Sequence, residues 1–401
     1  MASSFPQSKL GDVVDLFDNK RVPLNSQQRL ERQGKYPYYG AQGIIDYIDG
    51  FIFDGRYVLV AEDGENLNSR KLPLALLATG RFWVNNHAHI LRGKLEISDD
   101  LFILACLNNA DIKAFVTGAA QPKLSQANLL RIEIPLPPLP VQRRIAGILS
   151  AYDDLIENNQ RRIAILERMA RALYREWFVH FRYPGHESVP LVDSPLGPIP
   201  QGWEVRTVAD SFSVVGGGTP SRNIEKYWSE GTIQWFSPTD LTSTKSMFID
   251  DSRDHITQTG LAESSARLFP AGCIMLTSRA TIGAVSINTH EACTNQGFIT
   301  CIPNQRVPMY FLFHWIKDNV ATFERMASGA TFKEISRGVF KRIDFLHPAN
   351  SLVMQFENLI MPIAEQILSL QRQTQNLRRT RDLLLPRLLS GQLDVGELDD
   401  A

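Results

Sequence analysis

Residues 145–177 read IAGILSAYDDLIENNQRRIAILERMARALYREW, and this stretch decides the fold. Ten positions in it follow one another in alternating steps of four and three, and nine of the ten are apolar. These seam positions are Ile145, Leu149, Tyr152, Ile156, Asn159, Ile163, Leu166, Ala170, Leu173 and Trp177. A mean spacing of 3.5 residues keeps side chains on one side of a helix only when two helices supercoil. The stretch therefore predicts a long helix that pairs with a second helix.

An internal repeat of about 211 residues predicts the second helix. Adding 211 to each seam position gives ten residues in the same register, eight of them apolar. They are Phe356, Ile360, Ile363, Ile367, Leu370, Thr374, Leu377, Arg381, Leu384 and Leu388. Shorter patterns repeat as well: Gly118-Ala119 with Ser125 recurs as Gly329-Ala330 with Ser336, and RIEIPLP at 131–137 as RIDFLHP at 342–348. One duplicated unit explains these matches, and we expect its two helices to pair antiparallel about a pseudo-twofold axis.

Two residues within this pattern, Asn159 and Pro362, have more than one interpretation. Asn159 is either a buried polar group that fixes the helix register or an exposed residue near a kink. Pro362 either kinks the second helix or marks its start, and Pro386 interrupts the pattern farther on.

The remaining sequence predicts a globular part before each helix. Short β-branched and aromatic runs, such as YVLV at 57–60 and CIML at 273–276, indicate strands between Gly, Asn and Asp turns. Short helices are expected at 100–108 and 308–321. We therefore predict an α+β protein with two α/β globules and two long antiparallel coiled-coil helices. The predicted boundaries are 1–137 (first globule), 138–182 (first helix), 183–203 (Pro/Gly linker), 204–346 (second globule), 347–391 (second helix) and 392–401 (acidic tail).

Composition limits the possible partners and location. The 401 residues include 42 Lys and Arg against 43 Asp and Glu, so only a local concentration of basic residues could favour nucleic acid. Four cysteines without a CxxC pair fit a reducing compartment and argue against structural zinc. Since no apolar run reaches about 18 residues and the N-terminus lacks a signal-like core, we expect a cytoplasmic protein.

Five short motifs, in this order on a duplicated frame, indicate a family. They are IPLPPL at 134–139, QRRIAGIL at 142–149, DSPLGPIPQGW at 193–203, GTPS at 218–221 and LLPRLLSG at 384–391. Over essentially its full length the chain resembles the specificity (S, HsdS-type) subunit of Type I restriction–modification systems. The resemblance implies two target-recognition domains, each reading one half of a bipartite DNA site. It also implies that the helices set their separation and dock two methyltransferase (M) subunits, with restriction (R) subunits in the same complex.

Catalytic motifs are missing from the sequence. There is no Walker A, GxGxxG, GxSxG or HExxH pattern. There is also no Pro-Pro-aromatic run of the kind with which a methyltransferase holds a flipped adenine. The chain is therefore predicted to be a non-catalytic recognition subunit without a cofactor of its own. The resemblance implies that the complex uses S-adenosylmethionine for methylation, and ATP and Mg for restriction.

Polar and basic residues, several of them in matching places of the two halves, are the candidate DNA contacts. Asn and Gln can bind adenine through two hydrogen bonds, His can donate to a base or phosphate, and a loop Lys can reach phosphate. The candidates are Asn85, Asn86, His87, His89, Gln121, Lys123, Thr219, Ser221, Arg222, Arg279, Asn295, Gln296, Lys333 and Arg337. Polar strand edges, plain connecting loops or surface charges are the alternatives. His87 and His89 share a strand face, but no third ligand follows at convincing spacing, so no metal site is predicted. The GGGTPSR run at 216–222 lacks the spacing of a phosphate-binding loop.

Arginine recurs every seven residues on the outer faces of the predicted helices. The stripe consists of Arg161, Arg168, Arg175, Arg372 and Arg379. It is either a solvated helix face or a docking surface for a partner subunit. The alternative function is a coiled-coil scaffold that joins two ligand-binding globules without DNA specificity. The net charge of −1 favours this scaffold, whereas the duplicated frame and the motifs favour the recognition subunit.

Overall fold

The computed structural model describes residues 4–118, 120–329 and 333–396. Ala119 and Ala330 of the predicted repeat, and residues 397–401 of the predicted acidic tail, lie outside the described residues. The chain forms two compact units: Met1–Asn158 with Thr374–Ala401 (unit 1), and Asn159–Gln373 (unit 2). Unit 1 thus combines two segments that are distant in sequence, whereas unit 2 is continuous.

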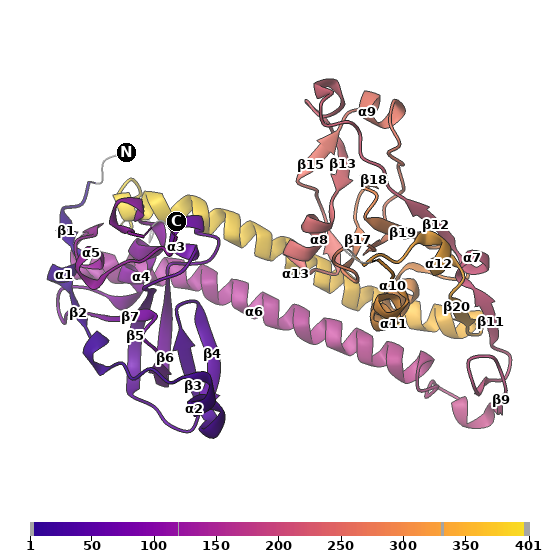
Figure 1. The fold of residues 1–401 in the computed structure, drawn as a ribbon, viewed down its shortest axis with the longest axis horizontal. Coiled ribbons are helices and arrows are strands. Elements are labelled where there is room, and N and C mark those ends of the chain that lie inside the picture. Colours follow the sequence, from indigo (N-terminus) through magenta and orange to yellow (C-terminus); the bar gives the residue numbers. More distant parts are fainter. Residues whose placement is uncertain (1–3, 119, 330–332, 397–401) are drawn as a thin grey trace. The chain divides into compact units, whose positions relative to one another are not determined.

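Two long helices, α6 (Leu139–Phe178) and α13 (Asn350–Ser390), each contribute to both units (Figure 1). Every predicted seam position on them is buried or half-buried, and Asn159 is only 6% exposed. The exposed alternative for Asn159 was therefore wrong. In unit 2 the ring of Phe356, near the start of α13, contacts the rings of Tyr174 and Phe178, near the end of α6.

The prolines of the second helix do not limit it. α13 begins at Asn350 and continues through Pro362 and Pro386 as one helix of 41 residues. The interpretation that Pro362 marks the start of the helix was therefore wrong. Since proline has no N–H, it leaves the carbonyl four residues earlier without its helical donor.

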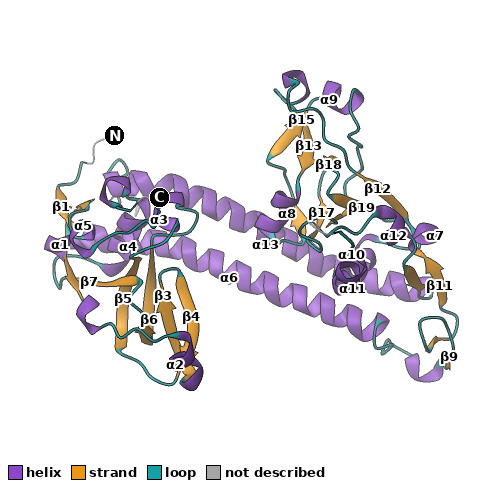
Figure 2. Ribbon diagram, viewed as in Figure 1, coloured by secondary structure: helices purple, strands orange, loops and turns teal. Residues whose placement is uncertain are grey.

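Unit 1 contains a six-stranded sheet with α4 (Asp100–Asn109) packed against it (Figure 2). The run at 57–60 lies in the central strand β5, where Val58 and Val60 face α4 and α6 while Tyr57 and Leu59 face the opposite side. The strands in order are β2 (Val14–Leu16), β7 (Ala88–Gly93), β5 (Phe53–Ala61), β6 (Ala75–Val84), β3 (Gln33–Gly40) and β4 (Gly43–Ile48). A strand pair, β1 (Gln7–Lys9) with β8 (Glu133–Pro135), and the helices α1 (Leu10–Val13), α2 (Ser26–Glu31), α3 (Asn66–Ser69) and α5 (Gln126–Leu129) complete it.

Unit 2 divides its strands among several sheets. The five-stranded sheet has the order β12 (Ser213–Gly216), β19 (Phe298–Ile302), β16 (Ile274–Thr277), β17 (Val285–Asn288) and β14 (Phe248–Ile249). The three-stranded sheet consists of β15 (Asp254–Ile256), β13 (Ile233–Phe236) and β18 (Ala292–Thr294), and the pairs are β11 (Glu204–Thr207) with β20 (Asp344–His347) and β9 (Leu191–Val192) with β10 (Ile199–Pro200). The helices are α7 (Val208–Ser211), α8 (Pro238–Thr244), α9 (Gln258–Ala262), α10 (Met309–Asp318), α11 (Val320–Met326) and α12 (Arg337–Lys341). The single helix expected at 308–321 is thus two helices that meet at Asn319.

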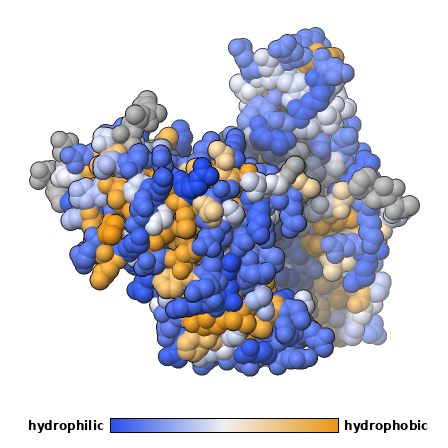
Figure 3. Space-filling model, turned by 60° about the vertical axis from the view of Figure 1, so that its left-hand side comes forward, coloured by the Kyte–Doolittle hydropathy of each residue, from blue (hydrophilic) through white to orange (hydrophobic). Residues whose placement is uncertain are grey.

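The surface is mixed in character. The face drawn in Figure 3 combines hydrophilic residues with hydrophobic patches. Among the described residues, no helix has the length and apolar character needed to cross a bilayer.

Candidate nucleic-acid interface

Three segments of unit 1 meet beside the sheet and bring several of the predicted DNA contacts together. This first junction consists of residues 62–64, 85–87 and 121–125. Main-chain hydrogen bonds connect the segments: Glu62 N donates to His87 O (2.9 Å), Leu124 N to Glu62 O (2.8 Å) and Gly64 N to Pro122 O (3.1 Å). The positions of the segments therefore depend on backbone groups rather than on side chains.

Unit 2 repeats the same connections. The second junction consists of residues 278–280, 295–297 and 333–337. Ser278 N donates to Gly297 O (2.8 Å), Ile335 N to Ser278 O (3.0 Å) and Ala280 N to Lys333 O (3.0 Å). Each hydrogen bond has its counterpart in the first junction, so the two junctions are one main-chain frame built twice.

Asn85 and Asn295 serve this frame. Each side-chain Oδ1 accepts a hydrogen bond of 2.8 Å from a main-chain N–H two residues on, that of His87 or Gly297. Asn85 is buried and Asn295 is half-buried. Both residues thus fit the alternative that the sequence left open, a polar turn that stabilises its own backbone.

His89 lies under the first junction. It is 1% exposed, its Nδ1 lies 2.5 Å from Asp18 Oδ2, and its Nε2 lies 2.8 Å from the carbonyl of Leu124. Both ring nitrogens are therefore engaged inside the protein. The structure contradicts the prediction that His89 contacts DNA, because a buried ring without a free nitrogen cannot reach a base.

Glu62 connects His89 to two cations. Its carboxylate lies 2.6 Å from Nη1 of Arg21 and 3.2 Å from Nζ of Lys123. Burial alone would raise the pKa of Glu62, but the hydrogen bond from Arg21, the charge of His89 and the hydrogen bond from Lys123 together lower it. Glu62 therefore stays ionised at the centre of this network.

The same group has the donor set of a metal site. Asp18, Glu62 and His89 place one ligand atom each within 4.8 Å of one another. The sequence did not show this cluster, because Asp18 lies 71 residues from His89 along the chain. However, Arg21 and Lys123 already form ion pairs with Glu62. Their positive charges thus balance the carboxylate that would otherwise bind a metal ion.

The exposed side chains of the first junction are the ones that can reach a ligand. Asn86, His87, Gln121 and Lys123 are exposed, and Nδ1 of His87 lies 2.7 Å from Asp63 Oδ2. An imidazole held by a carboxylate keeps its other nitrogen available for a base or a phosphate.

The second junction has a different set of side chains around a cavity of about 390 Å³. Gln296 and Arg337 line this cavity, and Thr219 Oγ1 donates to Gln296 Oε1 at 2.6 Å. Arg279 lies at the rim of the frame, 3.8 Å from Glu334, and Lys333 is exposed beside it. The structure thus brings together five of the predicted contacts.

One glycine of the run at 216–222 is required by close packing. A Cβ atom on Gly217 would overlap the carbonyl oxygens of Thr294 and Asn295, which belong to the backbone and exclude a larger residue. A Cβ atom on Gly216 would meet only the end of the Arg337 side chain, which can move aside. Gly217 therefore allows the backbone of the second junction to approach closely.

Arg222 is engaged elsewhere. Its guanidinium carbon lies 3.6 Å from the ring centroid of Trp228, and Nη2 lies 2.5 Å from Asp254. Ser221 is exposed next to it. Arg222 is therefore paired within unit 2 while its side chain stays 51% exposed, and its contact with DNA remains a prediction.

Two members of the arginine stripe are also engaged within unit 2. Arg372 forms two hydrogen bonds with Asp250, at 2.8 and 3.0 Å, and Arg175 lies 3.2 Å from Asp318. The pairing with Arg372 lowers the pKa of Asp250. Those two arginines therefore hold helix and globule together, whereas Arg168 and Arg379 are exposed.

Sequence reasoning missed Glu62, Asp63, Ser278 and Glu334. Glu62 and Ser278 are 216 residues apart rather than 211, because the two globules differ in length between the matching segments. A search for equivalent positions that allowed variable offsets could have found the pair.

Two α/β globules that share one main-chain frame, together with two long helices, define a class of duplicated proteins. The family model for the Type I restriction modification DNA specificity domain matches residues 3–168 and 200–350. This chain belongs to that family, and the resemblance carried by its motifs is confirmed.

Named relatives agree with this assignment. A stretch covering 43% of the chain is 34% identical to the Type I restriction enzyme MjaIX specificity subunit of Methanocaldococcus jannaschii, of which it spans only 39%. The HindI specificity subunit of Haemophilus influenzae is 22% identical over 98% of the chain and 95% of its own length. The crystal structure of the Type I S subunit from M. genitalium has the same fold, with a TM-score of 0.64, 16% identity and 96% coverage of both chains.

Proposed function

We propose that this chain is the DNA sequence-specificity subunit of a Type I restriction–modification complex. In this proposal it recognises a bipartite site in double-stranded DNA and positions two methyltransferase subunits and the restriction subunits. The observation that carries it is the pair of junctions, which share one main-chain frame but differ in side chains. A bipartite target requires two readers of this kind, placed alike and different in chemistry.

Local charge supports the second junction as a DNA contact. It combines Arg279, Lys333 and Arg337 with one acidic residue, Glu334. A net charge of −1 over the whole chain therefore does not prevent a basic surface at this place. Arginine at such a position suits guanine, and Gln296 suits adenine.

The helices complete the proposal. Phe356 contacts Tyr174 in unit 2, and Arg381 contacts Asp153 in unit 1, so in both units the beginning of one helix lies beside the end of the other. Together with the buried seam, these contacts support an antiparallel coiled coil with pseudo-twofold symmetry. The target-recognition domains would then be residues 1–137 and 204–346.

The chain has a recognition role rather than a catalytic one in this proposal. It binds no cofactor or metal itself, while partner subunits use S-adenosylmethionine, ATP and Mg. A cytoplasmic location is part of the same proposal.

Methylome sequencing tests the function. In a host that produces the cognate methyltransferase subunit, adenine methylation should appear at one bipartite site only when this chain is also present. If methylation is the same without the chain, the alternative of a coiled-coil scaffold without DNA specificity takes its place.

Substitution in one junction should affect one half-site. Arg279→Ala together with Arg337→Ala should relax or abolish recognition of one half-site, with each lost base contact worth about 1–3 kcal/mol. Lys123→Ala, a change in the first junction, should leave that half-site unchanged. If both half-sites change in either variant, the junctions are not separate readers.

A further inference from the structure

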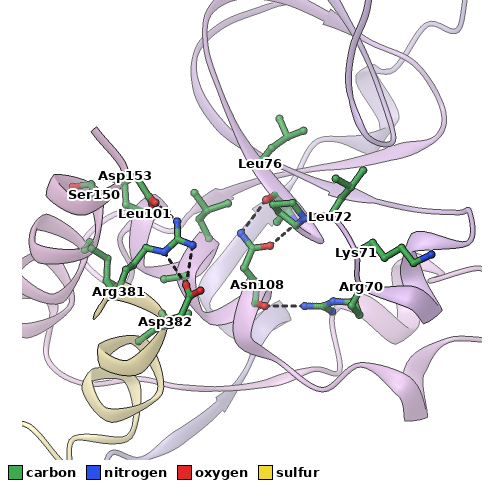
Figure 4. A pocket seen from close by; sticks show the side chains of 17 residues that line it. Arg70, Lys71, Leu72, Leu76, Leu101, Asn108, Ser150, Asp153, Arg381 and Asp382 are labelled. Carbon is green, nitrogen blue, oxygen red and sulfur yellow. Dashed lines mark hydrogen bonds and ion pairs between the residues drawn. The ribbon is translucent and has the colours of Figure 1, made fainter. Parts of the chain in front are cut away.

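A cavity of about 730 Å³ opens in unit 1 between α4, α6, α13 and residues 70–76 (Figure 4). Leucine and alanine side chains from the three helices form its apolar walls. Arg70 and Lys71 lie at one side, and the ion pair of Arg381 with Asp153 lies at the other. This volume is in the range of protein cavities that bind an occupant.

Unit 2 provides an internal comparison for this cavity. Its helix α10 corresponds to α4 at an offset of 209 residues. Four core positions of α4 are buried, and the four positions 209 residues later in α10 are buried as well. They are Phe102, Ile103, Cys106 and Leu107 in α4, and Phe311, Leu312, Trp315 and Ile316 in α10. The long helices match at an offset of 211, since α6 begins at Leu139 and α13 at Asn350.

In unit 2 the equivalent space is filled by larger side chains. The position of Ala105 is taken by His314 and that of Leu385 by Tyr174, whose rings stack at 5.8 Å. Both rings are buried, with Tyr174 only 3% exposed, whereas Ala105 and Leu385 are half-buried. Ala146 is matched in the same way by Glu357. The cavity thus exists because unit 1 lacks the aromatic side chains that fill this place in unit 2.

The cavity wall also contains an unused hydrogen-bond donor. Nη2 of Arg70 donates to the carbonyl of Asn108 at 2.8 Å, but Nη1 is buried and has no partner among the described residues. A buried guanidinium N–H without an acceptor is costly, and a carboxylate is the acceptor that suits it best. Leu72, at the same rim, is 54% exposed, so apolar surface continues outward from the cavity.

We infer that this cavity receives an aromatic side chain from the methyltransferase subunit, with a carboxylate beside it that pairs with Arg70. The inference rests on the proposed function, because it takes that subunit as the partner. An aromatic group fits because unit 2 places Tyr174 and His314 in the equivalent space. A protein segment fits better than a free molecule, because the exposed Leu72 extends the apolar surface beyond the cavity.

The test fills the cavity as unit 2 does. The full-length double variant Ala105→His with Leu385→Tyr should bind the purified cognate methyltransferase subunit at unit 1 at least tenfold more weakly than the wild type, while the second methyltransferase subunit, which meets this space already filled at unit 2, should bind unchanged. Its melting temperature should be equal or higher, because the cavity becomes packed. Leu383→Tyr is the matched control: Leu383 is 56% exposed on the same helix, does not line the cavity and should leave affinity unchanged.

Each outcome decides the question. If the filled variant binds as tightly as the wild type, the cavity is not the docking site, while the proposed function stands. If the wild-type chain itself fails to bind the methyltransferase subunit, the proposed function and this inference both fail. Should the filled variant not fold, Leu72→Asp at the exposed rim and Arg70→Gln replace it. Each should weaken binding, and unchanged affinity in both would overturn the inference.

Discussion

At the residue scale, His89 illustrates what a local pattern can and cannot predict. Its spacing from His87 predicted that both residues share a strand face, but His87 lies exposed in the turn before β7, whereas His89 is buried within the strand. The pattern could not show that Asp18 and Glu62 approach from distant segments and bury the ring. Whether a side chain is exposed depends on such long-range contacts. The sequence motif therefore identified polar candidates but could not separate residues that contact DNA from residues that stabilise the fold. Asn85 and His89 are buried and stabilise the protein itself, whereas Arg222, Gln296 and Arg337 remain candidate DNA contacts.

Glu62→Gln should destabilise the protein at neutral pH. The folded state lowers the pKa of Glu62, so its ionised form contributes stability above its unfolded pKa of about 4.3. We expect a loss of about 1–3 kcal/mol at pH 7 in urea unfolding, because Arg21 and Lys123 lose a charged partner.

That contribution starts to fall only below the unfolded pKa of about 4.3 and is lost as pH drops through the lower folded pKa, so wild type and variant should converge only below the folded pKa. Glu65→Gln, an exposed neighbour, serves as the control. A difference between wild type and Glu62→Gln that stays constant from pH 7 to pH 3 would contradict the ionic role of Glu62.

At the element scale, the long helices were the most predictable part of the molecule. Their seam follows from a periodicity that twenty positions share, and the structure leaves none of them exposed. The stripe on the outer faces was less predictable. Asp250 and Asp318, which bind two of its arginines, belong to a globule whose path the heptad pattern does not describe.

Charge reversal should separate the two kinds of stripe arginine. Arg168→Glu with Arg379→Glu should weaken co-purification of the methyltransferase subunit without changing the melting temperature, since both residues are exposed. Arg372→Glu should instead lower stability by about 0.5–1 kcal/mol through repulsion from Asp250. If the methyltransferase subunit co-purifies undiminished with the Arg168→Glu, Arg379→Glu variant, these two arginines belong to a solvated helix face and not to a docking surface.

Pro362 should be a weak point of α13. Its missing N–H leaves the carbonyl of Asn358 without a helical donor, so Pro362→Ala should raise the free energy of unfolding by as much as about 3 kcal/mol. Gln375→Ala, at an exposed position of the same helix, should change it by a few tenths at most. A Pro362→Ala protein of wild-type stability would mean that the helix already accommodates the proline without cost.

At the scale of the whole molecule, the duplication was predictable and the sheets were not. Repeated motifs indicated two α/β globules from the sequence alone. The six-stranded sheet of unit 1 joins Val14 to Gly93, and unit 2 distributes its strands over several sheets. Strand order depends on such distant pairings, which local periodicity does not encode.

Lengthening both helices should lengthen the unspecified spacer of the DNA site. Seven residues inserted after Asn159 and seven after Leu370 keep the 3.5-residue seam and add about 10.5 Å of helix. That length corresponds to about three base pairs of B-DNA at 3.4 Å each. Methylome sequencing should therefore show identical half-sites with a longer spacer. An unchanged spacer, or altered half-site bases, would show that these helices do not determine the spacing.

The duplicated frame has a consequence for how such a chain can evolve. Backbone amides and carbonyls connect its segments, so a mutation at an outward-facing side chain does not remove those connections. Lineages can accumulate substitutions in one copy while the other copy stays as it was, and neither copy loses its foldability. Mutations can therefore change which side chains a junction presents while its main-chain hydrogen bonds, and with them its fold, are inherited unchanged.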